Sequence, residues 1–534
     1  MSFDNELSSK NGSLSLPAEI LVEIFSLCLP SDHIRLSTPP QLLPPFTLAQ
    51  VCSQWRYLVL STPRLWSHIV LGHHGMNSSK EVSTFEFWLQ RTGTSQPLDI
   101  LLDPQADDAL DVLLNEEACA TYERETAMLI EKFCANSQRW RSLVLDVLSS
   151  SVLDPLFGSL STLYPNGLPT APLLQELELT TTLLGSAEDT RILHNFAVTC
   201  PQLRSLTLTC PMLLPVPVGA RDFSVLENMR VLRLRFCTDV SNALAWIDIC
   251  PNLECFKVHL LCETNIEEDN PEIGEFDGLD EEIEDDGDLN DGGWVIVNSP
   301  SRAHAISQSG IGSVQATSVR RLAHLTQLEI ITFSTAAPVG KLLDSLSTPS
   351  LRSLKISSVQ ARVDPLNARW IHVPLLLHRS DMPPIEELEI NGVPMNTDDM
   401  RATLALVPRL RKLTIGWFQE LDGLLQEMKA RDHQTSGMPG QNEIDSILCP
   451  HLETLNVAEA YFSVDILASM VSSRCMFGRG SPSVYCKPVV VGLKELCVRE
   501  NAKEEIVRHP IIAGCVAQGL NVIESEPLLS FRVR

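Results

Sequence analysis

The sequence predicts an α/β protein in which a short all-helical N-terminal segment precedes a long, irregular solenoid, with parallel strands on its concave face and helices on its convex face. Three observations support this. Apolar residues recur at helical spacing over residues 16–30 and 47–58, a leucine-based frame returns ten times between residues 173 and 498, and apolar residues at helical spacing lie between its copies. A chain of 534 residues exceeds the roughly 250–300 at which a single core stops growing, which favours several domains or a repeat array.

The first predicted element is a helix over residues 16–30, with the sequence LPAEILVEIFSLCLP. Pro17 suits the first helical position, where its missing N–H costs nothing. One apolar stripe is then expected from residues at spacings of one and four: Ile20, Leu21, Ile24, Phe25 and Cys28. Residues 1–14, which precede this helix, are expected to be disordered.

A Pro-rich insertion at residues 37–46 separates this helix from a second one. Thr47 and Gln50 can form a capping box and Phe46 can pack on Val51, so the second helix is expected to start at Thr47. Its apolar face would carry Leu48, Val51, Cys52, Trp55 and Leu58, and Ser61-Thr62-Pro63 would end it. Helices totalling about fifty residues bury too little surface to be stable alone, so this segment needs a neighbour.

The repeat is a loosely kept L-x-x-L-x-L frame. Its copies lie at residues 173–179, 201–208, 228–234, 251–258, 324–330, 350–356, 384–390, 409–415, 451–457 and 492–498. Each copy ends in alternating apolar and polar residues, which is the period of a short strand with one buried face. The polar members are expected to face outward: Thr207, Arg233, Lys257, Lys355, Glu389 and Asn456.

The spacing of the copies is typical of leucine-rich repeats. The first positions Leu174, Leu203, Met229 and Leu253 lie 29, 26 and 24 residues apart, within the usual 20–29, and longer gaps indicate insertions. The unit that begins at Met229 resembles the Cys-containing leucine-rich repeat. Strand-like segments at 65–71, 96–103 and 139–147, with helical patterns at 80–91 and 122–136, extend the predicted array over residues 67–534.

Composition limits the classes of function. The formal net charge of −26 argues against a general affinity for nucleic acid or anionic membranes. The fifteen cysteines show no zinc-ligand spacing, which indicates free thiols in a reducing compartment. No run approaches the 18 apolar residues of a membrane-spanning helix, and the N-terminus lacks the pattern of a signal peptide. We expect a cytoplasmic or nuclear protein without a cofactor or a structural metal.

An acidic insertion lies in the longest gap between repeat copies. Residues 263–291 contain fifteen Asp or Glu and no Lys or Arg, and without them the net charge would be −11. Such a segment cannot bury enough apolar surface to offset its ordering entropy, so residues 263–293 are expected to form a disordered loop. A solvated spacer is the favoured interpretation, and a contact for a basic partner is the alternative.

The N-terminal segment resembles the F-box. The order of three blocks, the spacing within each block and the closing Leu-Trp match that motif: LPAEILVEIF, LAQVCSQWRYL and STPRLW. The Pro-rich insertion departs from the commonest F-box. Together with the following WLQRTG…PLDI segment, it resembles the F-box proteins abundant in mushroom-forming (basidiomycete) fungi. The resemblance is strong over residues 16–102 and architectural beyond. It implies an apolar face that docks on a Skp-family adaptor of a cullin–RING ubiquitin ligase.

By the family's pattern, nine residues would divide between the motif's own core and the adaptor: Leu16, Pro17, Ile20, Leu21, Ile24, Phe25, Val51, Cys52 and Trp55. The resemblance thus implies a non-catalytic substrate-recognition subunit. Its unknown protein target would contact the concave strand face, through residues such as Arg233, Arg235, Lys257, His259 and Lys355. We find none of the common hydrolase, phosphate-binding or metalloprotease motifs. The alternative is a leucine-rich-repeat scaffold or chaperone that binds basic partners through the acidic loop.

Overall fold

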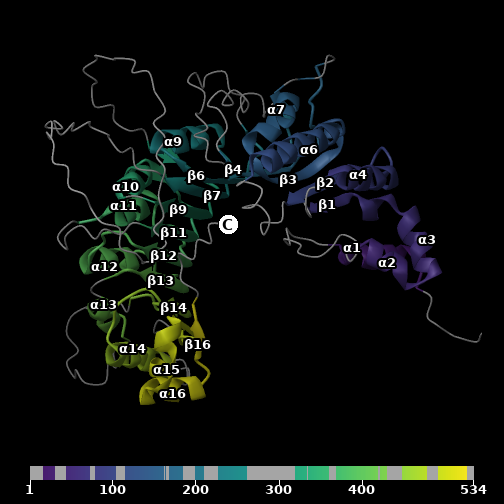
Figure 1. The fold of residues 1–534 in the computed structure, drawn as a ribbon. Helices are drawn as coiled ribbons and strands as arrows, with labels where there is room; N and C mark the ends of the chain where they lie inside the picture. Colours follow the sequence, from purple (N-terminus) through teal and green to yellow (C-terminus); the bar gives the residue numbers. More distant parts are fainter. Residues whose placement is uncertain are drawn as a thin grey trace, which may run out of the picture. The chain divides into compact units, whose positions relative to one another are not determined.

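A computed structural model shows a mixed α/β chain (Figure 1). It describes residues 16–29, 44–72, 78–103, 115–161, 163, 167–183, 199–209, 226–260, 319–333, 335–359, 369–418, 421–429, 448–477 and 491–525. The chain divides into two units, Met1–Cys262 with Val319–Arg534, and Glu263–Ser318. The predicted disorder of residues 1–14 and of the acidic insertion, and most of the Pro-rich insertion, lie outside the described residues.

The N-terminal segment is helical, as predicted. It contains α1 (Ala18–Leu27), α2 (Phe46–Val51), α3 (Ser53–Ser61) and the 3-10 turn η2 (Pro63–Trp66). Pro17 occupies the N-cap of α1, one residue before the expected position. Helix α1 contacts both α3 and η2, and α2 contacts α3, so the short helices share one small core.

A parallel sheet follows, and fourteen of its strands lie in the described part of the chain in the order β1-β2-β3-β4-β5-β6-β7-β9-β11-β12-β13-β14-β15-β16. Their bounds are β1 (His68–Gly72), β2 (Leu98–Asp103), β3 (Trp140–Ser149), β4 (Glu176–Leu183), β5 (Ser205–Thr209), β6 (Val231–Thr238), β7 (Cys255–Leu260), β9 (Gln327–Thr332), β11 (Ser353–Ser358), β12 (Glu387–Asn391), β13 (Lys412–Gly416), β14 (Thr454–Asn456), β15 (Glu495–Val498) and β16 (Asn521–Glu524). Each of the ten predicted copies of the frame contributes one strand. The strand β16 was not predicted.

Described helices lie in most of the connections between neighbouring strands, as is usual for parallel pairing. They are α4 (Ser78–Thr92), α6 (Glu116–Cys134), α7 (Asp154–Ser161), α9 (Val240–Ile249), α10 (Ala337–Asp344), α11 (His372–Arg379), α12 (Thr397–Ala405), α13 (Leu421–Glu427), α14 (Val464–Phe477), α15 (Glu500–Arg508) and α16 (Pro510–Ala517). Shorter elements are η4 (Ser137–Arg139), η5 (Ser150–Leu153) and the strand pair β8 (Arg320–Arg321) and β10 (Leu346–Ser347). From α9 to α14 each helix contacts the next one, so the helices form a row along the row of strands (Figure 1).

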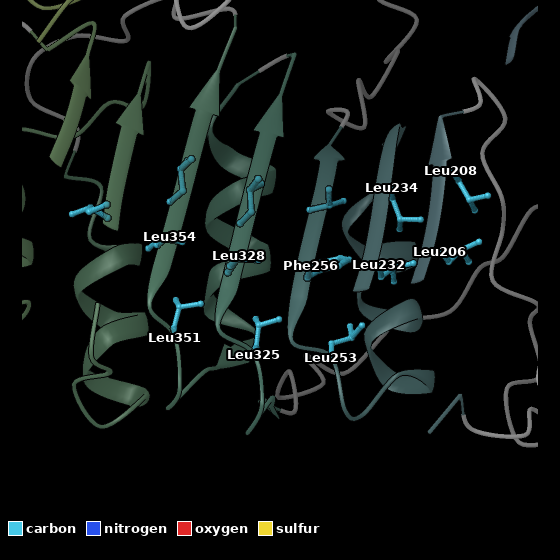
Figure 2. Packing of buried hydrophobic residues seen from close by; sticks show 14 of the residues in the cluster. Leu206, Leu208, Leu232, Leu234, Leu253, Phe256, Leu325, Leu328, Leu351 and Leu354 are labelled. Atoms are coloured by element: carbon cyan, nitrogen blue, oxygen red, sulfur yellow. The ribbon is translucent and has the colours of Figure 1, made fainter. Parts of the chain in front are cut away.

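Equivalent apolar residues of neighbouring strands stand side by side in the core. Leu206 pairs with Leu232, Leu232 with Phe256, Phe256 with Leu328, and Leu328 with Leu354, and all five are buried (Figure 2). The longest insertion does not disturb this register, because β7 pairs directly with β9 across residues 261–318. The parallel-strand prediction is confirmed, whereas the leucine-rich-repeat solenoid stays a prediction.

The backbone extends the register beyond the strands. The carbonyl oxygen of Arg230, which precedes β6, accepts the N–H groups of Glu254 and Cys255 at 2.7 and 3.0 Å. The carbonyl oxygen of Glu254 in turn accepts those of Thr326 and Gln327 at 2.8 and 3.1 Å. The same pattern recurs for the carbonyls that precede β4 to β14, so the start of each following strand is aligned with its neighbour.

A buried guanidinium connects two segments in the C-terminal part of the array. The side chain of Arg474 in α14 has no exposed surface. It donates to the carbonyl oxygens of Met428 at 2.9 and 3.1 Å, of Cys449 at 2.9 Å and of Leu448 at 2.6 Å. It therefore ties the end of α13 to the turn that precedes β14.

We predict that Arg474→Met lowers the stability of this region by about 3 kcal/mol or more, since the buried carbonyl groups lose their donors. Hydrogen exchange of the full chain, read over α13 and α14, measures the loss. The control is Arg401→Met, which removes a surface pair with Glu427 and Asp398 and should change stability by less than about 1 kcal/mol. Equal protection in both variants would contradict the role given to Arg474.

Candidate functional site

Helix α1 places part of its apolar surface in the core of the N-terminal segment. Phe25 is fully buried, and the centroid of its ring lies 4.7 Å from that of Trp55 in α3. Leu21, one turn earlier on the same side, is also buried. Leu21, Phe25 and the half-buried Trp55 therefore form the inner face, although the sequence pattern grouped Leu21 and Phe25 with the exposed residues in one stripe.

A second set of apolar residues, on α1 and just before it, is exposed. We call Leu16, Ile20, Ile24 and Leu27 the outer ridge: Leu16 precedes the helix, and the other three follow one another on α1 at spacings of four and three. Their exposed fractions are 44, 47, 39 and 86%. Pro17, which precedes the helix, is exposed as well. Large apolar side chains in such a line indicate an interaction surface.

The second predicted helix is in fact two helices. Helix α2 starts at Phe46 without a side-chain cap, so the predicted capping box at Thr47 is wrong. Cys52 interrupts the helix with an extended backbone (φ −157°, ψ 171°), and its Sγ accepts the N–H of Trp55 at 3.5 Å, at the start of α3. The interruption leaves Val51 and Cys52 exposed, together with Tyr57 on α3.

Phe46, which was predicted to pack on Val51, packs among aromatic side chains of other elements, and Val51 is 60% exposed. The ring of Phe46 packs edge-on against Trp66 at 5.4 Å and Trp88 at 5.6 Å, and stacks on Phe87 at 6.2 Å. Trp66 also packs on Trp88 at 5.2 Å. We call Phe46, Trp66, Phe87 and Trp88 the aromatic junction, since it joins the helical segment to α4, the first helix among the strands.

An ion pair fixes α1 against the turn η2. Arg64 donates through both terminal nitrogens to the carboxylate of Glu23, at 2.9 and 3.1 Å. These bonds and the charge of Arg64 lower the pKa of Glu23. In addition, the indole N–H of Trp66 donates to the carbonyl oxygen of Val59 at 2.8 Å. Helix α1 is therefore fixed by the packing of Phe25 on Trp55 and by the ion pair of Glu23 with Arg64.

The predicted target-binding residues lie on three strands. Arg233 and Arg235 are on β6, Lys257 and His259 on β7, and Lys355 on β11. Arg233, Lys257 and Lys355 belong to one row across the sheet, in which Glu329 of β9 stands between the two lysines. The other polar residues of this row include Thr207 and Asn456, which are nonetheless buried.

Most of these cations already have partners within the sheet. Lys257 pairs with Glu329, Lys355 pairs with Glu387 at 3.1 Å, and Arg235 lies 3.9 Å from Glu178. Arg233 donates to the hydroxyl of Thr207 at 3.4 Å. The strand face therefore presents charges of both signs rather than a basic patch.

Burial and pairing shift two pKa values on this face. Burial lowers the pKa of His259 to about 4, so its ring, which packs on Phe333, is neutral at pH 7. Burial alone would raise the pKa of Glu387, but hydrogen bonds from Lys412, Lys355 and Ser353 outweigh it and lower that pKa to about 2. His259 therefore contributes no positive charge to a target surface.

Among the described residues, His, Cys, Asp and Glu side chains do not gather in groups of three that could hold a metal ion. None of the described helices has the length and apolar character to cross a membrane.

Comparison with known proteins identifies the N-terminal segment. Residues 13–72 match the model of the F-box-like family. No curated protein matches the chain. The predicted F-box is thereby confirmed, and such a domain indicates a general role in binding Skp-type adaptors of ubiquitin ligases. The repeat family of the array and the fungal origin stay predictions.

Sequence reasoning missed three features of this segment. Leu27 and Tyr57 are among the most exposed apolar side chains of the described residues, yet neither was proposed as a contact. The spacing 16-20-24-27 could have indicated Leu27. The aromatic junction could not have been found from periodicity, since its residues come from three different elements.

We predict that Phe25→Ala and Ile24→Ala differ in their effect on the helical segment. Loss of the buried Phe25 ring should cost about 3–5 kcal/mol of local stability, whereas truncation of the exposed Ile24 should cost well under 1 kcal/mol. Limited proteolysis and hydrogen exchange over residues 16–66 measure the difference. Equal protection of the two variants would show that the inner face is misassigned.

We also predict a pH-dependent contribution from Glu387. Because its pKa is lower in the folded chain than the ordinary value of 4.5, its stabilisation is complete above pH 4.5 and is lost as the pH falls towards 2. Glu387→Gln should destabilise the chain by about 1 kcal/mol at pH 7, a modest value because the carboxylate is partly solvated. Between pH 7 and pH 3 the difference in thermal midpoint from the wild type should begin to shrink below pH 4.5, without closing at pH 3, and a constant difference would contradict this origin.

Proposed function

We propose that this chain is the substrate-recognition subunit of a Skp–cullin–F-box ubiquitin ligase. The observation that carries the proposal is the outer ridge, a line of exposed apolar side chains on the first helix of an F-box-like domain whose inner face is already filled. An adaptor groove that covers Leu16, Ile20, Ile24 and Leu27 would remove this surface from water. Val51, Cys52 and Tyr57 offer a second exposed area on the α2–α3 pair.

The free energy gained from such docking would exceed the cost of association by only a small margin. Complete burial of a large apolar side chain contributes roughly 1.5–3 kcal/mol, and these side chains are already partly covered. Burial of the six largest of these side chains would contribute on the order of 10 kcal/mol to the free energy of binding. They are Leu16, Ile20, Ile24, Leu27, Val51 and Tyr57. Association costs about 4–15 kcal/mol, so the two quantities are comparable. Loss of one or two contacts should therefore abolish detectable binding.

The array would serve as the target-binding part. We infer that it is an irregular leucine-rich-repeat solenoid, supported by ten regularly framed parallel strands with helices between them. Its strand face carries Arg233, Arg235, Lys257 and Lys355 among glutamates, so a target must complement both signs of charge. His259 would contribute as a neutral ring.

The mechanism would be proximity rather than catalysis by this chain. The adaptor and cullin bring a charged conjugating enzyme near the bound target, and the effective concentration of a target lysine rises without a catalytic side chain from the receptor. The aromatic junction supports this role, because it packs the F-box directly onto the first helix among the strands. The cytoplasm or nucleus, where these ligases act, is the proposed location.

We predict that Ile24→Asp abolishes co-purification with a Skp-type adaptor. A carboxylate on the outer ridge would have to be desolvated in the groove, so affinity should fall by about 100-fold or more. Leu16-Pro17→Ala-Ala, which shortens the same ridge, should weaken binding as well. The measurement is a pull-down of the full chain with purified adaptor, with circular dichroism as the check on folding.

The matched control is Met128→Asp, which places the same charge on an exposed apolar position of α6 outside the F-box-like domain. It should retain the adaptor fully. If Ile24→Asp also retained it at the wild-type level, the outer ridge would not be the docking surface. If the wild-type chain bound no adaptor, the scaffold alternative would take its place.

A further inference from the structure

A polar or charged position recurs at the start of the strands. It directly follows a buried apolar residue, and Figure 2 shows three of these apolar residues, Leu253, Leu325 and Leu351, side by side. We call the residues that follow them and their equivalents the strand-entry row: Arg204, Arg230, Glu254, Thr326, Arg352, Glu386, Arg411, Glu453 and Lys494. From Arg204 to Glu453, the carbonyl oxygen of each member accepts two N–H groups of the next segment, so neighbouring members lie side by side.

Neighbours of opposite charge pair with each other along this row. Arg230 lies 3.7 Å from Glu254, and Arg352 lies 2.7 Å from Glu386. Thr326 interrupts the pattern, because it stands between the carboxylate of Glu254 and the guanidinium of Arg352. Neighbouring strands are about 4.8 Å apart, so the backbones of these two charged residues are separated by roughly 10 Å, with Thr326 between them.

A cavity lies at this interruption. Its volume is about 420 Å³, and its wall contains Glu254, Thr326 and Arg352 of the row together with residues of the adjacent loops. The hydroxyl groups of the wall are used within the chain, since Thr326 donates to the carbonyl oxygen of Glu254 at 3.0 Å and Ser350 donates to that of Ala323 at 2.6 Å. Glu254 and Arg352 are therefore the charged groups that can select a ligand.

Both charged side chains have room for a further partner. The side chain of Arg352 is 60% exposed and bonds to Glu386 through one terminal nitrogen, whereas a guanidinium carries five N–H donors. The side chain of Glu254 is 54% exposed, and its distance of 3.7 Å from Arg230 is longer than a hydrogen bond. Exposed pairs of this kind contribute little to stability, so a ligand can compete with them. His324 adds an exposed imidazole to the same wall.

We propose that this cavity binds an extended segment of the target protein in which a basic and an acidic residue are two positions apart. Such side chains lie on one face of the segment, about 7 Å from each other, and can reach Glu254 and Arg352 respectively. Pro349 and Pro384 supply the apolar part of the wall. The inference rests on the proposed target-binding role and deepens it by naming the chemistry of the target.

Saturation-transfer difference NMR with the full chain tests the proposal, because this method detects weakly bound peptides. The probe is acetyl-Gly-Lys-Ala-Glu-Gly-amide. We expect saturable binding with a Kd of about 1 mM, the range of a short contact. The neutral peptide acetyl-Gly-Gln-Ala-Gln-Gly-amide should bind about tenfold more weakly, because it can form neither ion pair.

Substitutions in the cavity locate the two charges. Glu254→Gln and Arg352→Gln should each weaken binding of the probe about fivefold, and Arg352→Lys, which keeps the charge, should recover most of the affinity. The peptide acetyl-Gly-Gln-Ala-Glu-Gly-amide lacks the basic residue. For this peptide Glu254→Gln should change the affinity by less than about twofold, since the partner of the carboxylate is already absent.

The same row supplies matched controls. Arg411 and Glu453 form an equivalent pair at 2.8 Å, and neither lines the cavity. Arg411→Gln and Glu453→Gln should therefore bind the probe as the wild type does. Circular dichroism checks that each variant is folded.

Three results would overturn the proposal. They are the absence of saturable binding at millimolar probe, equal binding of the neutral peptide, and equal losses of affinity in the cavity variants and the control variants. Adaptor co-purification of Glu254→Gln is measured in parallel and should equal the wild type. A failure of this site and a failure of the F-box to bind an adaptor are thus read separately.

Discussion

The whole array depends on one constraint, which is that equivalent apolar residues of successive parallel strands must stand in register. A slip by one residue would turn each core side chain to the opposite face of the sheet, as the two-residue period of a strand requires. From β4 to β14, the carbonyl that precedes each strand accepts two N–H groups of the next segment, and so aligns it before the buried row begins. Because this alignment is local to each strand pair, β7 and β9 pair normally even though 66 positions separate Leu260 from Thr326.

The F-box-like domain depends on the array through the aromatic junction. Its helices are too few to bury their apolar surface among themselves, and Phe46 and Trp66 complete their packing on Phe87 and Trp88 of α4. This contact accounts for the inner side of the domain, while the outer ridge of α1 stays exposed among the described residues. A division of one helix between an internal core and an exposed ridge is what a docking module requires.

Periodicity predicted the strands well because each copy of the frame carries its own alternation of buried and polar residues. It failed where contacts between distant residues decide the outcome. Phe46 lies in the aromatic junction at the start of α2, and Cys52 ends that helix and caps α3 with its Sγ, which the spacing of apolar residues did not indicate. We also predicted from the sequence that Lys257 and Lys355 are accessible cations. The sequence pattern could not reveal their partners Glu329 and Glu387, because these lie on neighbouring strands many residues away.

The central claim is that one side of α1 is covered by the chain itself and the other by an adaptor. Hydroxyl-radical footprinting of the full chain, with and without a purified Skp-type adaptor, tests it most directly because the method reports on individual side chains. The account predicts that Leu16, Ile20, Ile24 and Leu27 become protected on addition of the adaptor, while Leu21 and Phe25 are unreactive in both states. Unchanged reactivity of the outer ridge at saturating adaptor would contradict it.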